Sequence, residues 1–198
     1  MFKIGNSAAH LLRYCVGLDS ADTQTTLAER QCLNRYAAGK MRMIEIGVFE
    51  GVGTRVLAGA IAQGGQLFAI DPFVTGRLGV NWGKLIALSE IRKANSCGTV
   101  TLVKGFSWEA ANLLDGTFDM IFIDGDHSLE GIRRDWEDWS CRVESNGIIA
   151  LHDTRVPAHD SGVANLGSCM FFDSHIKVDP RFLLCEQVDS LSIMKRVK

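Results

Sequence analysis

Two short polar segments, Asp124-Gly125-Asp126-His127 and His152-Asp153, bring carboxylates and imidazoles together directly after apolar runs. Neighbouring carboxylates can bind a divalent cation through their oxygen atoms, and Asp124 and Asp153 are the candidate ligands. Carboxylates can also orient a general base, and the candidates for that chemistry are His127, Asp126 and His152. Asp124 and Asp153 could instead cap helices or bind backbone amides, so the residue types leave both alternatives open.

A glycine-rich segment has the spacing G-x-x-x-G-x-G at Gly47, Gly51 and Gly53. Glycines let a backbone turn approach a ligand closely and let a helix begin against it, although a tight turn without any ligand has the same composition. The spacing differs from the G-x-G-x-x-G dinucleotide fingerprint. Asp71 ends the next apolar run, where a carboxylate can accept hydrogen bonds from both hydroxyls of a ribose. Together these residues predict a nucleoside-binding site.

The elements that would position these residues alternate between apolar runs and helical segments. The apolar runs are 41–48, 66–71, 99–105, 118–124 and 147–153, and the helical segments are 54–63, 84–95, 107–114 and 129–143. Continuous apolar runs are typical of parallel strands buried on both faces, so the alternation predicts a doubly wound, Rossmann-like α/β fold. Residues 181–188 and 190–197 predict a C-terminal antiparallel hairpin, which completes a mostly parallel seven-stranded sheet.

Three more local predictions concern the helices. Ser107 is expected to be the N-cap of the segment 107–114, without a capping box. Trp136 and Trp139 lie on one helical stripe and are expected in the core. Residues 1–40 predict a helical N-terminal cap of the same domain, with one or two helices in 21–38.

Composition and charge exclude several classes of protein. The 198 residues include 23 acidic and 21 basic ones, and this balance is unlike the basic excess of a nucleic-acid-binding protein. The sequence lacks both a signal-peptide pattern and an apolar stretch of about 18–20 residues. Its six cysteines form no C-x-x-C pair, which favours reduced thiols over disulfides or a zinc site. We expect a cytoplasmic protein with no nucleic-acid or membrane partner.

Five segments together resemble the class I S-adenosylmethionine (SAM)-dependent methyltransferases. More closely, they are similar to the small-molecule O-methyltransferase-like group with an I-D-G-D-H-S-x-E-G signature. The segments are MIEIGVFEGVGTRVLA, FAIDPF, LVKGFSWEAA, MIFIDGDHSLEGIRRDWEDW and GIIALHDT. IDGDHS and LHD are the most specific of them. The resemblance implies a methyltransferase domain over residues 41–198, with residues 1–40 as a variable cap that helps to form the substrate pocket.

The resemblance also implies where the cofactor SAM would bind. Glu45, Gly47, Gly51 and Gly53 would surround its methionine part, Asp71 would hold the ribose, Phe73 would contact the adenosine, and Gly105, Phe106 and Ser107 would lie beside the adenine. Asp124 would lie near the methyl-transfer centre. In metal-dependent relatives, acidic residues after the fourth and fifth strands bind magnesium, and Asp124 and Asp153 match those places. His152 stands where those enzymes often have an aspartate.

Methyl transfer from a sulfonium requires that the acceptor atom be aligned with the methyl group. A hydroxyl acceptor must also lose its proton to a base or have its pKa lowered by a divalent cation such as Mg²⁺. We therefore expect methyl transfer to a hydroxyl of a small metabolite. The alternatives are an NAD(P)-dependent oxidoreductase on a related sheet and a non-catalytic cofactor-binding module. The loops 74–83 and 155–168 would complete the acceptor pocket, and the N-terminal helices could pack against a second copy.

Overall fold

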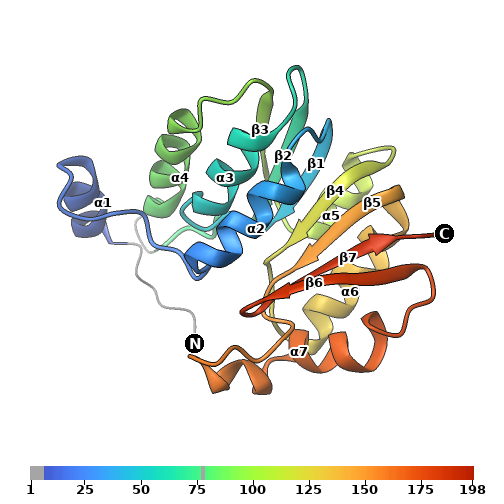
Figure 1. Ribbon diagram of the computed structural model, residues 1–198. Helices are drawn as coiled ribbons and strands as arrows, with labels where there is room; N and C mark the ends of the chain where they lie inside the picture. Colours follow the sequence, from blue (N-terminus) through green and yellow to red (C-terminus); the bar gives the residue numbers. More distant parts are fainter. Residues whose placement is uncertain (1–6, 77–78) are drawn as a thin grey trace.

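The computed structural model describes residues 7–76 and 79–198, which form helices around one seven-stranded sheet (Figure 1). The strands are β1 (Arg42–Ile46), β2 (Gln66–Asp71), β3 (Thr99–Lys104), β4 (Phe118–Ile123), β5 (Val143–Leu151), β6 (Phe182–Val188) and β7 (Leu191–Arg196). Their order across the sheet is β3-β2-β1-β4-β5-β7-β6. Strands β1 to β5 are parallel, whereas β7 runs antiparallel to both β5 and β6. The predicted doubly wound sheet and C-terminal hairpin are therefore confirmed.

Helices cover both faces of the sheet (Figure 1). One group contains α1 (Ala8–Cys15), α2 (Leu27–Ala37), α3 (Val52–Ala60) and α4 (Trp82–Lys93). The other contains α5 (Ser107–Leu113), α6 (Leu129–Trp139) and α7 (Gly167–Phe171), with the short helices η1 (Ser140–Arg142), η2 (Ser161–Asn165) and η3 (Phe172–Ile176). Within the first group, α2 packs on α3, α3 on α4, and α4 on α1.

The core explains why the strands are continuously apolar. Met43 of β1 shares a buried cluster with Leu33 of α2 and Leu57 of α3. Its neighbour Ile44 belongs to the cluster on the opposite face, with Trp136 of α6. Both faces of β1 are thus covered, and its residues from Met43 to Ile46 are all buried. Trp136 and Trp139 are 5% and 0% exposed, as predicted.

The N-terminal segment is helical where the structure describes it. Helix α2 lies within the predicted range 21–38, whereas α1 precedes that range and was not predicted. Thr26 caps α2 through a hydrogen bond from the Glu29 amide to its hydroxyl, and the Glu29 carboxylate accepts from the Thr26 amide. This reciprocal capping box fixes where the helix begins. The boundary of the cap at residue 40 stays a prediction.

The predicted start of α5 is wrong by one residue. Phe106 is the N-cap, and Ser107 is the first helical residue. The Glu109 carboxylate accepts a hydrogen bond from the Phe106 amide at 2.8 Å. The Ser107 hydroxyl instead donates to the carboxylate of Asp135 on α6. Because the Ser107 hydroxyl bonds to the buried carboxylate of Asp135, it does not cap the start of α5.

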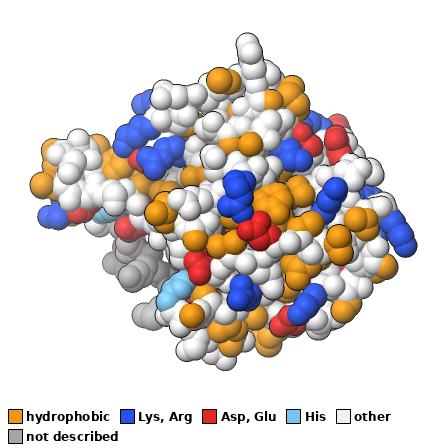
Figure 2. Space-filling model, in the orientation of Figure 1, with side chains coloured by type: hydrophobic (Ala, Val, Ile, Leu, Met, Phe, Trp, Pro, Cys, Tyr) orange, Lys and Arg blue, Asp and Glu red, His pale blue; other side chains and the backbone are white. Residues whose placement is uncertain are grey.

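The surface has mixed charge on the face drawn in Figure 2, where Lys and Arg side chains are interspersed with acidic and hydrophobic ones. No helix among residues 7–76 and 79–198 has the length and apolar character needed to cross a membrane. All six cysteines are free thiols, as predicted, and two of them, Cys32 and Cys169, are buried.

Candidate active site

The predicted site residues follow the carboxyl ends of neighbouring strands, which lie at one edge of the sheet. Backbone hydrogen bonds join the turns that begin there. The Gly47 amide donates to the Ile70 carbonyl, and the Asp124 amide donates to the Ile46 carbonyl. The His152 amide continues this pattern with the Ile123 carbonyl. The turns after β1, β2, β4 and β5 are thereby held side by side.

The turn after β1 requires glycine at two positions. Gly47 has a φ of 92°, and a Cβ atom there would overlap the Asp124 carbonyl oxygen. Gly51 has a φ of 81°, and its Cβ would lie 2.8 Å from the Cα of Ala87 on α4. Both positions lie in the left-handed region that favours glycine. These glycines are therefore explained by the packing of the turn, whether or not a ligand binds there.

Asp71 ends β2 and holds two turns at once. Its Oδ2 atom accepts hydrogen bonds from the amides of Val48 and Phe49 at 3.0 and 3.1 Å. Its Oδ1 atom accepts from the Phe73 amide at 2.6 Å. A carboxylate has about four lone-pair sites, so three amide donors leave capacity for one further donor such as a ribose hydroxyl. The structure thus gives Asp71 the role of a turn aspartate, which is the alternative to ribose binding for a carboxylate directly before Pro72.

Glu45 on β1 is a fully buried carboxyl beneath the glycine turn. The Thr54 hydroxyl donates to its Oε2 atom at 2.5 Å, while Oε1 has no hydrogen-bond partner. Burial raises the pKa of Glu45 well above its ordinary value. A Cβ on Gly53 would lie 2.6 Å from Oε1, so glycine at that position leaves room for this carboxyl. The resemblance to SAM-dependent methyltransferases implies that this carboxyl lies near the methionine part of the cofactor.

Three of the six residues other than glycine that have a positive φ in the described part of the chain lie in the turns of the candidate site. Phe49, Phe73 and Asp153 have φ values of 52°, 42° and 53°, in the left-handed region. Such conformations are costly for residues other than glycine and cluster at functional sites. Phe73 is buried, whereas Phe49 is 43% exposed. Each of the three residues lies in a turn that follows a strand of the parallel sheet.

His152 is a buried cation surrounded by carboxylates. Its Nε2 atom lies 3.3 Å from Oε2 of Glu29, and its Nδ1 atom lies 3.0 Å from Oδ1 of Asp124 and 3.5 Å from Oδ1 of Asp153. The contact with Asp124 is an ion pair whose angles do not suit a hydrogen bond. Burial acts to lower the pKa of His152, but the negative charge of Asp124 and the other carboxylates outweighs it and raises the pKa well above its ordinary value. Both ring nitrogens face acceptors, so His152 is not free to accept a proton from a substrate.

Glu29 is the site residue that the sequence analysis missed. It is 1% exposed. Its Oε1 atom accepts hydrogen bonds from the amide and the hydroxyl of Ser190, in the turn between β6 and β7. Burial acts to raise the pKa of Glu29, but His152 and the hydrogen-bond donors lower it to about 2. The spacing Thr26-x-x-Glu29 could have predicted a capping box, but not a contact with His152.

His127 is the more accessible histidine. Its Nδ1 atom lies 3.3 Å from Oδ2 of Asp153, and its Nε2 atom lies 3.7 Å from Oδ1 of Asp124. Its side chain is 22% exposed, compared with 2% for His152. We call Glu29, Asp124, His127, His152 and Asp153 the carboxylate–histidine cluster. Of the two histidines in this cluster, only His127 has a side chain that is partly accessible to solvent.

Asp126 is not counted in the carboxylate–histidine cluster, because its hydrogen bonds are to Ser128. Its Oδ1 and Oδ2 atoms accept hydrogen bonds from the amide and the hydroxyl of Ser128 at 2.9 and 3.0 Å. Ser128 is in turn the N-cap of α6. Asp126 therefore organises the start of this helix, whereas the sequence predicts a catalytic role for it.

The donor atoms of the carboxylate–histidine cluster do not form a metal site made of protein groups alone. Such a site needs three or more protein donors around one point, whereas Mg²⁺ can also bind through one or two carboxylates and water. Among the residues that the structure describes, only His10, Asp22 and Glu50 form such a group, with ligand atoms all within 4.8 Å of one another. Asp124 and Asp153 instead both face the imidazolium of His152. A positive charge already lies between the two carboxylates.

The turn after β3 presents aromatic rings rather than a free hydroxyl. Ser107 is buried and bonded to Asp135, whose pKa burial raises to about 6. The rings of Phe106 and Trp108 are stacked, with centroids 4.3 Å apart, and the Arg134 guanidinium lies 4.1 Å from the Trp108 centroid. Gly105 precedes this stack with an extended backbone. The outer part of the Phe106 side chain is exposed.

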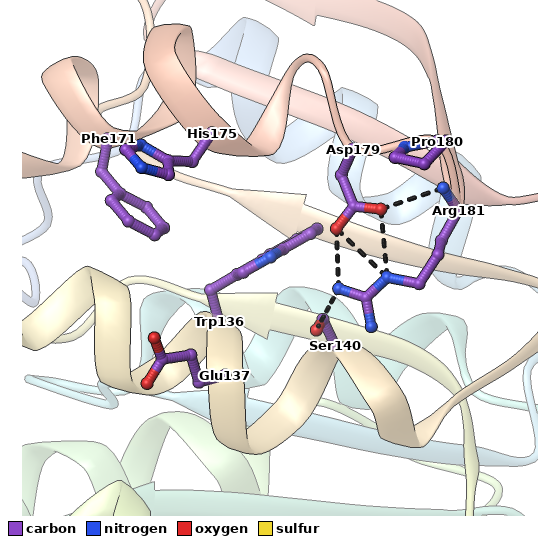
Figure 3. A pocket seen from close by; sticks show the side chains of 8 residues that line it. All are labelled: Trp136, Glu137, Ser140, Phe171, His175, Asp179, Pro180 and Arg181. Atoms are coloured by element: carbon purple, nitrogen blue, oxygen red, sulfur yellow. Dashed lines mark hydrogen bonds and ion pairs between the residues drawn. The ribbon is translucent and has the colours of Figure 1, made fainter.

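Two surface hollows lie elsewhere on the protein, and none of the predicted site residues lines them. The hollow drawn in Figure 3 has a volume of about 610 Å³ and is lined by Trp136, Glu137, Ser140, Phe171, His175, Asp179, Pro180 and Arg181. Two of its charged groups pair with each other, since Arg181 donates to both carboxylate oxygens of Asp179. The second hollow, of about 440 Å³, lies between α1 and α4. The candidate active site is therefore defined here by its side chains and turns.

The sheet order, the glycine turn after β1 and the acidic residues after β4 and β5 define a Rossmann-like fold of the methyltransferase type. A family model described as a methyltransferase domain matches residues 44–154, more than half of the sequence. The chain belongs to this methyltransferase-domain family.

Solved structures agree in fold. An O-methyltransferase from Bacillus cereus in complex with SAH is 20% identical, has a TM-score of 0.64, and aligns over 99% of this chain and 94% of its own. TomG, an O-methyltransferase from Streptomyces achromogenes involved in tomaymycin synthesis, was solved in complex with SAM. It is 18% identical, has a TM-score of 0.65, and aligns over 96% of this chain and 89% of its own.

One curated relative is the uncharacterized protein y4gI of Sinorhizobium fredii. It is 23% identical over 133 residues, which are 65% of this chain. The chain spans about 15% of the length of that relative.

Proposed function

We propose that this chain transfers a methyl group from SAM to a hydroxyl of a small metabolite in the cytoplasm. The observation that carries the proposal is the position of His127, an accessible imidazole between two carboxylates in a chain of the methyltransferase-domain family. The similarity to O-methyltransferases solved with SAH and SAM supports the choice of cofactor and of an oxygen acceptor.

The turns after β1, β2 and β3 would hold the cofactor. The unpartnered Oε1 atom of Glu45 and the close-packed glycines 47, 51 and 53 suit the methionine part. The remaining capacity of Asp71 suits one ribose hydroxyl, and the exposed ring of Phe106 suits the adenine. When bound, SAM supplies an electrophilic methyl group on a positively charged sulfur. The net negative charge of the nearby cluster would favour that cation.

His127 is the proposed general base. The carboxylate of Asp153 beside Nδ1 favours a proton on that nitrogen, which leaves the Nε2 lone pair for the acceptor. Nε2 would take the hydroxyl proton as the oxygen attacks, and general-base assistance of this kind typically contributes about 10²–10⁴-fold. Asp124 would stabilise the imidazolium that results, because its Oδ1 atom lies 3.7 Å from Nε2.

His152 has a different proposed role. As a buried imidazolium it partly neutralises Asp124 and Asp153, so that these carboxylates can lie close together without a metal ion. Glu29 holds His152 in this state from the opposite side. On this proposal the enzyme needs neither Mg²⁺ nor another divalent cation for methyl transfer.

The deciding experiment combines binding with turnover. Calorimetric titration should show saturable binding of SAM and SAH and no binding of NAD⁺; the reverse result would support the oxidoreductase alternative. SAH formation is then measured with a panel of hydroxylated aromatic and aliphatic compounds, for wild type, His127→Asn and the matched variant His175→Asn. We expect turnover in wild type and His175→Asn only. Cofactor binding without turnover of any compound would favour the non-catalytic module.

A further inference from the structure

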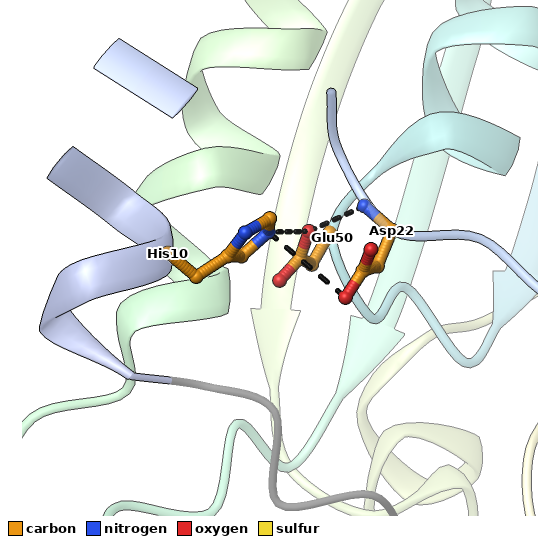
Figure 4. A group of neighbouring side chains, drawn as sticks. All are labelled: His10, Asp22 and Glu50. Carbon is orange, nitrogen blue, oxygen red and sulfur yellow. Dashed lines mark hydrogen bonds and ion pairs between the residues drawn. The ribbon is translucent and has the colours of Figure 1, made fainter. Parts of the chain in front are cut away.

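Three side chains from distant parts of the sequence meet beside the glycine turn, outside the carboxylate–histidine cluster (Figure 4). His10 comes from α1, Asp22 from the segment before α2, and Glu50 from the turn after β1. The Nε2 atom of His10 lies 3.1 Å from Oε2 of Glu50 and 4.0 Å from Oδ2 of Asp22. Their ligand atoms all lie within 4.8 Å of one another.

The other ring nitrogen of His10 is held by a second carboxylate. Nδ1 lies 3.3 Å from Oδ2 of Asp19, and Arg13 fixes Asp19 through two hydrogen bonds of 2.8 and 3.0 Å. Histidines that bind metals usually donate their second N–H to a carboxylate or carbonyl, which orients the ring and raises the basicity of the ligating nitrogen. Asp19 gives His10 this arrangement and directs Nε2 at Asp22 and Glu50.

Burial and charge are also suited to a cation. Glu50 is 1% exposed, and the Asp22 amide donates to its Oε2 atom at 2.6 Å, which fixes its orientation. The side chain of Asp22 is 59% exposed, so one side of the group is open to water and to an entering ion. A neutral imidazole with two carboxylates has a charge of −2, which a divalent cation neutralises. The charge of Asp19 is already balanced by Arg13.

We propose that His10, Asp22 and Glu50 form a binding site for a divalent transition metal of the Zn²⁺ type. One imidazole nitrogen and two carboxylate oxygens suit Zn²⁺ or Co²⁺, whereas Mg²⁺ and Ca²⁺ prefer oxygen ligands alone. Ligand atoms about 2.0–2.2 Å from a tetrahedral Zn²⁺ are about 3.4 Å apart. The measured separations of 3.1 and 4.0 Å bracket that value, so small side-chain shifts complete the site, with water as the fourth ligand.

The test uses the full chain, stripped with a chelator and then desalted. Zn²⁺ binding is measured by calorimetry and by elemental analysis after gel filtration, and Co²⁺ is added separately to record its ligand-field absorption. We expect one Zn²⁺ per chain and a Co²⁺ spectrum of the four-coordinate type without a thiolate charge-transfer band. A thiolate band would place the metal on cysteine and overturn the proposal, as would less than stoichiometric binding.

Variants separate this site from adventitious binding. His10→Gln should abolish stoichiometric binding, whereas the matched variant His175→Gln, which changes an exposed histidine elsewhere, should bind as wild type does. Asp19→Asn should weaken binding about 10–100-fold although Asp19 contacts no metal, because loss of an orienting carboxylate has effects of that size. Equal affinity in wild type, His10→Gln and Asp19→Asn would show that the three residues form only ion pairs. Asp22→Asn, at an exposed position, repeats the test if a buried substitution prevents folding.

Discussion

The carboxylate of Glu29 lies 3.3 Å from the imidazole of His152, and both side chains are almost completely buried. The two residues are 123 positions apart in the sequence. Glu29 comes from the N-terminal segment, whereas His152 ends the central part of the sheet at β5. Part of the electrostatic environment of the candidate active site is therefore supplied by a helix that precedes the methyltransferase-domain match at residues 44–154.

Glu29→Gln should destabilise the protein strongly. The substitution leaves the His152 imidazolium without one of its partners, and loss of one member of a buried ion pair typically costs about 3–5 kcal/mol. Chemical denaturation of wild type and variant measures the difference. Glu186→Gln is the matched control, because Glu186 pairs with Arg35 near the surface, where such a pair contributes about 0–1 kcal/mol. Equal effects of the two variants would contradict the assigned role of Glu29.

Asp71→Ala should affect both cofactor binding and stability. If its carboxylate binds a ribose hydroxyl, the SAM affinity should fall by about 1.5–3 kcal/mol, the value of a hydrogen bond to a charged group. The amides of Val48, Phe49 and Phe73 also lose their acceptor, so the free energy of unfolding should fall. Calorimetry and denaturation measure the two effects, with Asp115→Ala at an exposed position as control. An unchanged SAM affinity would reject the ribose assignment.

His127→Asn should slow methyl transfer without weakening SAM binding. Loss of a general base lowers kcat by about 10²–10⁴-fold, while the affinity for SAM depends on other turns. Asp153→Asn should lower kcat less, since it removes only the carboxylate beside Nδ1. Steady-state kinetics with the acceptor identified from the panel checks both variants. A His127→Asn enzyme with the kcat of wild type would exclude this histidine as the base.

Asp135→Asn should change how stability depends on pH. The pKa of Asp135 is about 6 in the folded protein, above the value of about 3.9 expected when unfolded. Protonated Asp135 is favoured by folding, so its contribution is full below about pH 3.9 and is lost as the pH rises to about 6. Relative to wild type, the variant should therefore gain stability across this range, by up to about 3 kcal/mol. Denaturation at several pH values measures the difference, and a constant difference would contradict the raised pKa.

Removal of Mg²⁺ should leave the rate of methyl transfer unchanged. The carboxylates Asp124 and Asp153 already face the imidazolium of His152, which partly neutralises them and lies between them, where a metal ion would otherwise bind. The measurement compares chelator-treated enzyme before and after addition of Mg²⁺. Recovery of a lost rate by Mg²⁺ alone would show that the carboxylates bind that ion during catalysis.

Most of the fold could be predicted because its strands have a strong local signal. The continuous apolar run that contains Met43 and Ile44 follows from helices on both faces, and the hairpin around Asp189 follows from the short distance between two β-rich segments. The placement of the site at the strand ends could be predicted for the same reason, because parallel strands carry their following turns to one edge.

The individual contacts could not be predicted, because they depend on tertiary partners. Ser107 has the residue type and the position in the sequence that are typical of an N-cap, yet its hydroxyl donates a hydrogen bond to Asp135 on a neighbouring helix. Asp126 lies in a segment of the sequence that predicts a catalytic carboxylate, yet it accepts hydrogen bonds from Ser128 two residues away. Glu29 has the sequence of an ordinary capping-box residue, and nothing near it in the chain indicates His152. In each case a side chain with several possible acceptors or donors binds the one that the fold brings near.

The hydrogen bonds between Glu29 and Ser190 also impose an order on folding during synthesis. The two residues are 161 positions apart, so at about 5–20 residues per second Glu29 is made roughly 8–30 s before Ser190. Until the final hairpin forms, one oxygen of Glu29 lacks its two donors from Ser190 and His152 remains incompletely enclosed. We therefore expect the candidate active site to be assembled late in folding, after most of the parallel sheet.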